Sequence, residues 1–137
     1  MAFVFDGIGE DEPIGDFPSL VNEWGAAGFE LDYCDPRLAP PHALVVATAD
    51  GFGPEYEVHA FVKAGGAAQH PDLHADLVFL EYPHGGAVFN FSSISWSACL
   101  SYNDYDNNVS RLTRNVLEGF LAESPAWLNA AGHSPRT

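Results

Sequence analysis

The chain has 137 residues, which is the length of one domain. Hydrophobic residues make up 47% of it and aromatic residues 13%, so it has enough apolar surface to form a core, which excludes an intrinsically disordered protein. It carries 19 Asp and Glu residues against 5 Lys and Arg residues, a formal net charge of −14. A field of that sign repels phosphate groups. We therefore expect neither nucleic acid nor a membrane surface as a partner.

The acidic excess has two interpretations that the sequence leaves open: ordinary solubility, or adaptation to high salt, where screening reduces self-repulsion. The N-terminal residues lack the basic and apolar regions of a secretory signal, and no apolar run approaches the ~20 residues of a membrane span. We expect a soluble, cytoplasmic protein. Cys34 and Cys99 fit neither a redox nor a zinc spacing, so two reduced, buried thiols are predicted.

The organisation along the chain is that of a single domain with three regions: an irregular stretch at 1–41, a sheet and helix core at 42–122, and a frayed tail at 123–137. Gly and Pro recur through the first region and interrupt helices. Within it, Phe3 and Phe5 flank one predicted short strand. The alternation of Phe29 and Leu31 indicates another.

The core begins with a continuous apolar run at 43–48, which is typical of a central strand covered on both faces. Two further β-branched and aromatic runs, at 56–62 and 76–82, are predicted to be strands. Residues 87–96 are interpreted as a strand that enters a Ser-rich turn. Strands followed by one strong helix favour an α/β layered arrangement.

That helix is predicted after the polar loop at 101–108, because apolar residues recur there at helical spacing. They are Val109, Leu112, Val116, Leu117, Phe120 and Leu121. Either Asp106 or Asn107 is suited to cap its N-terminus by accepting hydrogen bonds from free backbone N–H groups. Arg114 and Glu118 stand four residues apart and are expected on its exposed face.

The polar groups between the last strand and this helix are candidates for a ligand site, since α/β proteins place such sites at the carboxyl ends of strands. The residues expected to face a ligand are Ser93, Ser95, Trp96, Asn103, Asn107, Asn108 and Arg111. Arg111 would supply a fixed cation for an anionic product or for a carboxylate of the helix and loop. In the alternative interpretation, the serines only satisfy the backbone of the turn and helix end. No residue is assigned a catalytic role.

Histidines supply a second candidate, a divalent metal site that would serve a small metal-dependent hydrolase. Its ligands would be His59, His70, His74 and Glu81, with Asp72 or Asp76 as a further donor. The alternative is that the histidines are scattered over the surface and that Glu81 faces solvent at a sheet edge. The chain alone is expected to hold no cofactor.

Several blocks of residues, in the same order, resemble the C-terminal region of the N,N-dimethylformamidase large (beta) subunit family. The blocks are residues 7–17, 25–32, 40–42, 85–89, 93–96, 105–111 and 115–117. The resemblance implies a Rossmann-like fold of the class I glutamine amidotransferase type, here partial or shortened, and the hydrolysis of small amides to an amine and a carboxylic acid. It also implies a mononuclear iron held by tyrosine and glutamate side chains upstream of the matched region.

Two hypotheses on function follow. In the first, the chain is a scaffolding domain of an amide hydrolase, associated with a larger subunit of the same family or with itself, and a small amide is the substrate of the assembly. In the second, it is a stand-alone, non-catalytic binding or oligomerisation module whose exposed aromatic residues form an interface. A sheet that lacks half of a doubly wound domain leaves edges uncovered, which favours association in either case.

Overall fold

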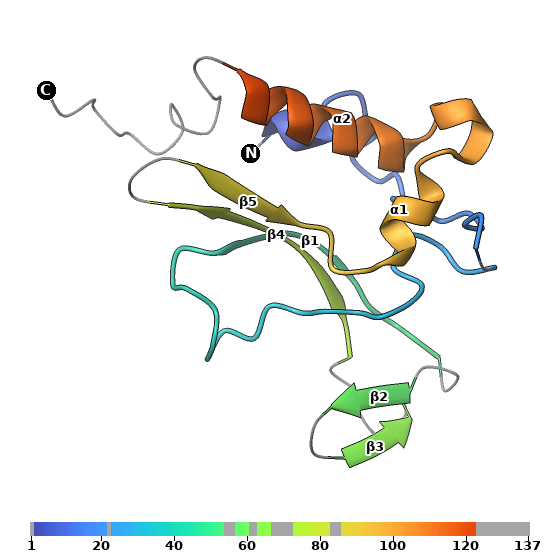
Figure 1. Ribbon diagram of the computed structural model, residues 1–137, viewed down its shortest axis with the longest axis vertical. Helices are drawn as coiled ribbons and strands as arrows, with labels where there is room; N and C mark the ends of the chain where they lie inside the picture. Colours follow the sequence, from blue (N-terminus) through green and yellow to red (C-terminus); the bar gives the residue numbers. More distant parts are fainter. Residues whose placement is uncertain are drawn as a thin grey trace, which may run out of the picture. The chain divides into compact units, whose positions relative to one another are not determined.

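The computed structural model describes residues 2–21, 23–53, 57–60, 63–66, 73–82 and 86–122. Its contacts divide the chain into two compact units. The sheet unit is Glu30–Ser93, and the terminal unit joins Met1–Phe29 to Ile94–Thr137. The strands lie in the sheet unit and the helices in the terminal unit (Figure 1).

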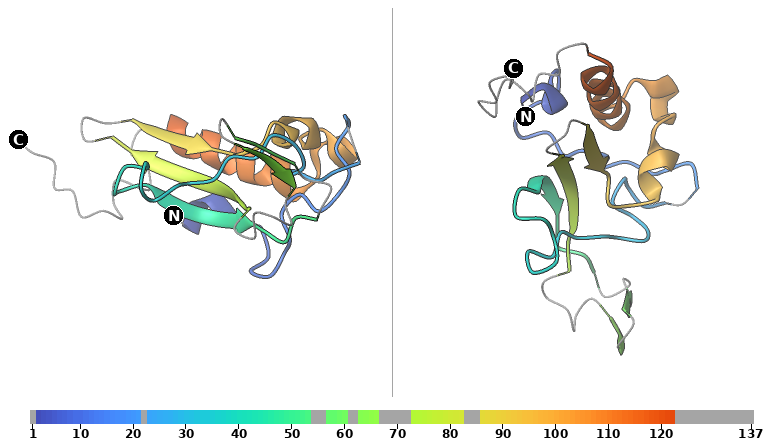
Figure 2. Two further views of the ribbon diagram at one scale, coloured as in Figure 1. Left: turned by 90° about the horizontal axis from the view of Figure 1, so that it is seen from below. Right: turned by 60° about the vertical axis from the view of Figure 1, so that its left-hand side comes forward.

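The sheet unit contains a three-stranded antiparallel sheet. Its order is β1 (Leu44–Ala49), β4 (Ala75–Glu81) and β5 (Ala87–Asn90), so β4 is central, and the views of Figure 2 keep these strands together. Leu77 and Phe79 of β4 are buried, as expected for a strand with neighbours on both edges. The predicted strand at 76–82 is therefore confirmed, and it is the middle of the sheet.

The expectation of a central strand at 43–48 is half correct. β1 forms there, but it pairs only with β4 among the described residues, and Leu44 and Val45 are about half exposed, at 49% and 48%. A run of β-branched residues favours a strand without fixing its place in the sheet. A bulge between Val45 and Ala47 interrupts the register of this edge strand, which is a usual feature of sheet edges.

A second, separate ladder joins β2 (Glu57–Ala60) to β3 (Lys63–Gly66), which confirms a strand within 56–62. Every ladder among the described residues is antiparallel. A Rossmann-like core is built from parallel strands. The described ladders do not include the parallel pairing that would identify that fold class, so it stays a prediction. The single-domain organisation also stays a prediction.

In the terminal unit, the described residues form two α-helices, α1 (Ser95–Cys99) and α2 (Asn108–Leu121), and two 3₁₀ helices, η1 (Ala2–Phe5) and η3 (Tyr102–Tyr105). α2 confirms the helix predicted from the apolar spacing. Val109, Leu112 and Val116 are fully or almost fully buried, whereas Leu117 and Leu121 near its C-terminal end are exposed. Arg114 and Glu118 lie on its exposed face, as predicted.

η1 packs against α2, and both views in Figure 2 place them side by side. Gly119 allows this approach, because a Cβ added there would lie 2.6 Å from Cε2 of Phe3. The strand predicted around Phe3 and Phe5 is wrong, since these residues form η1. The buried side chain of this element is Val4, between the half-buried Phe3 and Phe5.

Two other sequence expectations are refined. The strand predicted to enter a Ser-rich turn within 87–96 is confirmed as β5, which ends at Asn90 before the serines, but residues 95–99 form α1, a single helical turn too short to leave a periodic signal. The strand predicted around Phe29 and Leu31 reduces to one isolated bridge between Leu31 and Ser93. Cys34 and Cys99 are free thiols. Cys99 is buried as expected, but Cys34 is only half-buried.

None of the helices in the described ranges has the length and hydropathy that a membrane crossing requires.

Candidate functional site

In the sheet unit, the carboxylate of Asp76 joins three segments of chain. Its Oδ2 accepts a hydrogen bond from the backbone N–H of Cys34 at 2.8 Å, and its Oδ1 accepts one from the Thr48 hydroxyl at 2.7 Å. Nε2 of His74 lies 3.2 Å from Oδ2. The Asp76 side chain is only 3% exposed, so these contacts replace the hydrogen bonds to water that the carboxylate loses when it is buried.

His74 and Asp76 are brought together by strand geometry, because residues two apart in an extended segment point to the same side. The imidazole of His74 is 30% exposed and is oriented by two neighbours. One is the carboxylate of Asp76, and the other is the ring of Tyr33, whose centroid lies 5.0 Å away at a tilt of 50°. An imidazole held by a carboxylate is suited to accept, donate or relay a proton.

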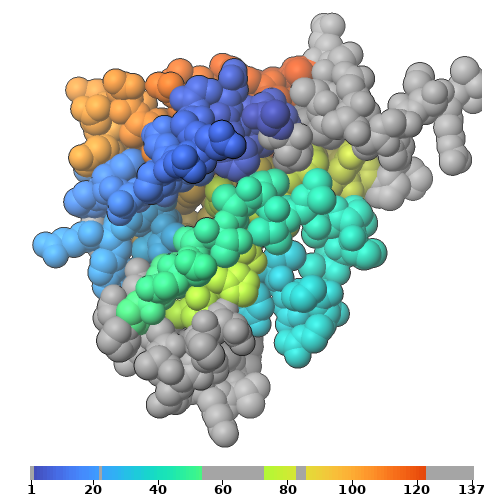
Figure 3. Space-filling view, turned by 180° about the vertical axis from the view of Figure 1, so that it is seen from behind, coloured from blue at the N-terminus to red at the C-terminus, as the bar shows by residue number. Residues whose placement is uncertain are grey.

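These groups line an open cavity of about 730 Å³ that lies wholly within the sheet unit. The lining residues are Cys34, Pro36, Ala39, Pro40, Pro41, Ala43, Val45, Thr48, Asp50, Leu73, His74 and Asp76. The volume is in the range of small-molecule sites, and a largely apolar wall with a few convergent polar groups is their usual composition. Figure 3 shows β1 at the surface beside β4, with the loop that precedes β1 next to them.

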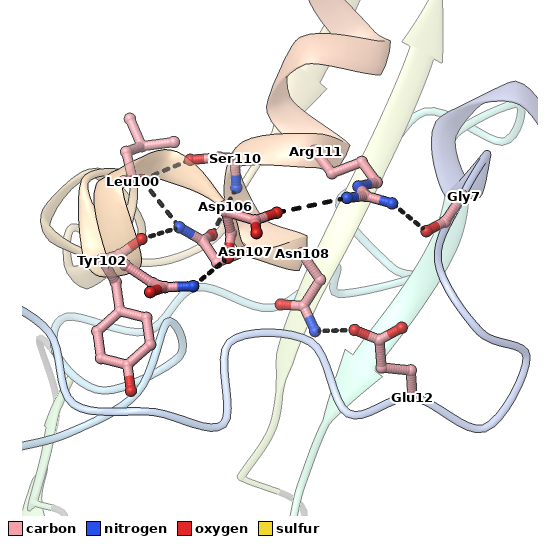
Figure 4. A network of polar contacts seen from close by, with 10 residues as sticks. Gly7, Glu12, Leu100, Tyr102, Asp106, Asn107, Asn108, Ser110 and Arg111 are labelled. Atoms are coloured by element: carbon pink, nitrogen blue, oxygen red, sulfur yellow. Dashed lines mark hydrogen bonds and ion pairs between the residues drawn. The ribbon is translucent and has the colours of Figure 1, made fainter.

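In the terminal unit, the sequence-predicted Asn107 caps α2 (Figure 4). Its Oδ1 accepts a hydrogen bond from the backbone N–H of Ser110 at 2.9 Å. Its Nδ2 donates to the carbonyl oxygens of Leu100 and Tyr102 at 3.0 and 2.7 Å. Of the two predicted caps Asn107 is the correct one, and its three hydrogen bonds tie the helix start to the turn before it.

Asn108 binds the N-terminal loop. Its Oδ1 accepts a hydrogen bond from the backbone N–H of Gly15 at 2.9 Å, and its Nδ2 donates to Oε1 of Glu12 and to the carbonyl oxygen of Pro13. Hydrogen bonds from the backbone N–H of Gly9 and from Asn108 lower the pKa of Glu12. This one amide therefore fixes a loop more than ninety residues away in sequence.

Arg111 also contacts the N-terminal loop, since its Nη1 donates to the carbonyl oxygen of Gly7 at 2.9 Å and its Nη2 lies 3.7 Å from Oδ1 of Asp106. It thus meets the helix-loop carboxylate anticipated from sequence. Arg111 and Arg114 line a small hollow of about 220 Å³ together with four residues of the preceding turn. Those residues are Asp104, Tyr105, Asp106 and Asn107.

The other sequence-predicted residues are spread over both units. Ser93 is half-buried in the sheet unit, where it forms the bridge to Leu31. Ser95 and Trp96 are buried on α1, at 3% and 6% exposure, and Nε1 of Trp96 donates to Oγ1 of Thr113 at 2.9 Å. Asn103 is exposed and donates to the carbonyl oxygen of Asp106.

The turn that holds Asn103 has an unusual backbone. Asn103, Asp104 and Tyr105 are consecutive residues with φ values of 51°, 52° and 68°. Asn and Asp tolerate this left-handed region, whereas Tyr does so at a cost in conformational energy. The hydrogen bonds of Asn103 and Asn107 to this turn support the conformation.

For the predicted metal site, the structure gives a partial answer. His70 and Asp72 lie outside the described residues, as does the side chain of His59, and Glu81 is half-buried on β4. Within the described ranges no three His, Cys, Asp or Glu side chains come together as a metal site. The iron implied by the family resemblance has its tyrosine and glutamate ligands upstream of the matched region, so it stays a prediction about the longer family enzyme.

Sequence reasoning considered His74 and Asp76 only as metal ligands and missed their partner Thr48. The sequence signal that was present is the His-x-Asp spacing at the start of a strand, which places both side chains on one face. No pattern pointed to Thr48 or to the backbone of Cys34, because they lie 28 and 42 residues from Asp76 in sequence.

Comparison with known proteins identifies the family. Residues 1–107 match the family model described as N,N-dimethylformamidase beta subunit-like, C-terminal. The N,N-dimethylformamidase beta subunit of Paracoccus aminophilus is 44% identical over 133 residues, and that of an Alcaligenes species is 42% identical over 132 residues. The matches cover 93% and 92% of this chain but only 17% of each relative. The chain therefore belongs to the N,N-dimethylformamidase beta subunit-like, C-terminal family.

Proposed function

We propose that this chain serves as the scaffolding C-terminal region of an amide hydrolase that acts on small N-substituted amides. The observation that carries the proposal is the 42–44% identity to two N,N-dimethylformamidase beta subunits over more than nine tenths of the chain. Because the chain spans only 17% of those relatives, the reaction and the implied iron are assigned to the rest of such an assembly. The partner is a larger subunit of the same family.

The geometry of the terminal unit supports scaffolding over catalysis. The side chains of Asn107, Asn108 and Arg111 all form hydrogen bonds with this chain's own backbone. Groups committed in this way hold a loop and a helix in place. A catalytic group needs a free position within hydrogen-bond reach of a substrate.

For the fold, we propose that the antiparallel sheet is an addition to a larger α/β layered core of the Rossmann-like, glutamine amidotransferase type. β1 presents an edge with exposed apolar residues that is suited to further pairing. The proposal predicts that this edge becomes protected from hydrogen exchange when the chain is part of the larger assembly.

The experiment grafts this chain into the Paracoccus aminophilus enzyme in place of its matching region and compares the graft with the graft carrying Arg111→Ala. Scaffolding predicts that Arg111→Ala lowers the amount of assembled enzyme, read by native mass spectrometry. Turnover of dimethylformamide per assembled molecule stays unchanged. An Arg111→Ala graft that assembles normally but loses turnover would contradict scaffolding. The matched control is Arg114→Ala, because Arg114 is also an exposed arginine on α2.

A second candidate function, a self-associating module, is favoured by a different observation. Several large apolar side chains are exposed, among them Leu38 at 85%, Leu121 at 83% and Val21 at 79%, and an interface between copies of the chain would cover such groups. Sedimentation of the chain at micromolar concentration tests it. A dimer or higher species supports this function, and a monomer rules it out.

A further inference from the structure

The cavity of the sheet unit has a wall that suits an aliphatic chain. Seven of its lining residues are apolar and rigid or short: Pro36, Ala39, Pro40, Pro41, Ala43, Val45 and Leu73. Prolines and alanines lose little side-chain entropy when they are covered, so the entropic cost of placing an apolar group against this wall is small. Apolar area that enters it is stabilised by about 25 cal/mol per Å².

The permanent charges around the cavity are negative. Asp50 and Asp76 line it together with His74, whose imidazole contacts Asp76, and no Lys or Arg among the described residues lines it. The nearest cation in sequence, Arg37, is occupied, because its Nε and Nη2 donate to the carboxylate of Asp35 at 2.9 and 2.6 Å. In a chain with a net charge of −14, the potential at this cavity favours a cation and disfavours an anion.

The two carboxylates differ in what they have left to offer. Asp76 already accepts hydrogen bonds from Cys34 and Thr48 and contacts His74. Asp50 is exposed and has no hydrogen bond or ion pair within the part of the chain that the structure describes. Asp50 is therefore the acceptor available to a ligand, and Asp76 is the group that holds the wall in shape.

From this combination we propose that the cavity binds an alkylammonium group, a cation on an aliphatic stem, with the stem on the proline-rich wall and the ammonium at Asp50. The chemistry is shared by a free alkylamine and by the side chain of a lysine on another polypeptide. The inference does not depend on the proposed function, because it concerns binding alone and requires no turnover.

The test is a ¹H–¹⁵N NMR titration of the 137-residue chain at constant ionic strength. The probe is n-butylammonium, and 1-butanol and butyrate carry the same stem without charge or with the opposite charge. Saturable shifts at the amides of Cys34, Thr48 and Asp50 with butylammonium, well beyond those with either control, are expected. No saturable shift, or an equal response to butanol, overturns the proposal.

Two substitutions in the cavity, Asp50→Asn and Ala39→Leu, locate the interaction, and Asp11→Asn is the control. Asp50→Asn is expected to weaken butylammonium binding about threefold, the size of one exposed ion pair. Asp11→Asn makes the same charge change at an exposed site in the terminal unit and is expected to have no effect. Ala39→Leu fills the apolar wall and is expected to weaken binding while leaving Asp50 in place. Equal weakening by Asp50→Asn and Asp11→Asn would reduce the effect to net charge and overturn the site.

A second arm distinguishes the two sources of the group. Nα-acetyl-lysine amide is titrated beside butylammonium, with Nα-acetyl-norleucine amide as the uncharged match. Tighter binding of the lysine derivative assigns the cavity to a lysine of a partner chain, and tighter binding of butylammonium assigns it to a free amine. Binding of neither cation overturns both.

Discussion

The buried carboxylate of Asp76 accepts hydrogen bonds from two other segments, at Cys34 and Thr48, and contacts the imidazole of His74. We predict that Asp76→Asn destabilises the protein by about 2 kcal/mol, because an amide NH₂ replaces one acceptor oxygen and leaves a buried donor unsatisfied. Thr48→Val removes a single contact and is expected to cost about 1 kcal/mol. Urea denaturation measures both. If Asp76→Asn is no less stable than Asp16→Asn, an exposed control, the contacts of the Asp76 carboxylate do not stabilise the protein.

Ser92 combines two unfavourable features. Its φ is 58°, and its hydroxyl is buried without a hydrogen-bond partner within the described structure. We predict that Ser92→Gly stabilises the protein by about 1 kcal/mol, because glycine relieves the backbone strain and removes the orphaned group, with part of the gain offset by backbone entropy. Ser97→Gly, on the exposed side of α1, is the control and is expected to destabilise. A less stable Ser92→Gly protein in urea would contradict this account.

The pair of Asp35 and Arg37 gives a prediction on pH. Hydrogen bonds from the side chain and backbone of Arg37 lower the pKa of Asp35 from 3.8 to about 2. A depressed pKa in the folded state means that the stabilising contribution is present above pH 3.8 and is lost as the pH falls toward 2. In Arg37→Gln, the NMR titration midpoint of Asp35 should return toward 3.8. An unchanged midpoint would show that the guanidinium of Arg37 is not the cause.

Among the elements, α2 depends on its cap. Asn107→Ala removes the acceptor for Ser110 and both donations to the preceding turn, and we predict a loss of about 1–2 kcal/mol in urea denaturation. Asn107→Asp separates the two roles. It keeps the acceptor and adds a favourable charge at the helix N-terminus, but it cannot donate to Leu100 and Tyr102. The stability of Asn107→Asp should fall between that of the unsubstituted protein and that of Asn107→Ala. If Asn107→Asp is as unstable as Asn107→Ala, the two donated hydrogen bonds dominate the effect of the cap.

The same element shows what sequence reasoning can reach. The spacing of Val109, Leu112 and Val116 and the position of Asn107 are local signals, so the helix and its cap were predictable. The left-handed turn at Asn103–Tyr105 was not, because positive φ at residues other than glycine leaves no periodic trace. The edge position of β1 and the contacts of Asp76 were also out of reach, since both depend on pairing between residues distant in sequence.

For the candidate site, the outcome follows the same physics. Sequence alone singled out Asn107, Asn108 and Arg111 as functional, and the structure gives each of them bonds to nearby or distant backbone. Polar residues before a helix serve capping and ligand binding with the same chemistry, so composition cannot separate the two roles. The observed contacts distinguish them: Asn107 bonds to the turn before α2, and Asn108 and Arg111 bond to the N-terminal loop.

At the scale of the whole molecule, charge is the dominant feature. The chain has nineteen Asp and Glu residues and five Lys and Arg residues. Two of the five cationic side chains, those of Arg37 and Arg111, lie near a carboxylate. The remaining acidic groups repel one another over about 10 Å at 0.1 M salt and over only about 3 Å at 1 M. The folded state brings these charges closer together than the unfolded chain does, so screening should favour folding.

We therefore predict that the melting temperature rises by several degrees between low and molar KCl. Neutralising exposed carboxylates provides the control within the chain: Glu10→Gln, Asp11→Asn and Asp16→Asn together should raise the melting temperature in low salt and reduce the further gain from KCl. If repulsion is the cause, the two effects must compensate, because charges that have been removed cannot also be screened. A KCl-induced gain that the triple variant leaves untouched would instead point to an effect of salt on apolar burial, and a flat melting temperature would leave the acidic excess as a matter of solubility alone.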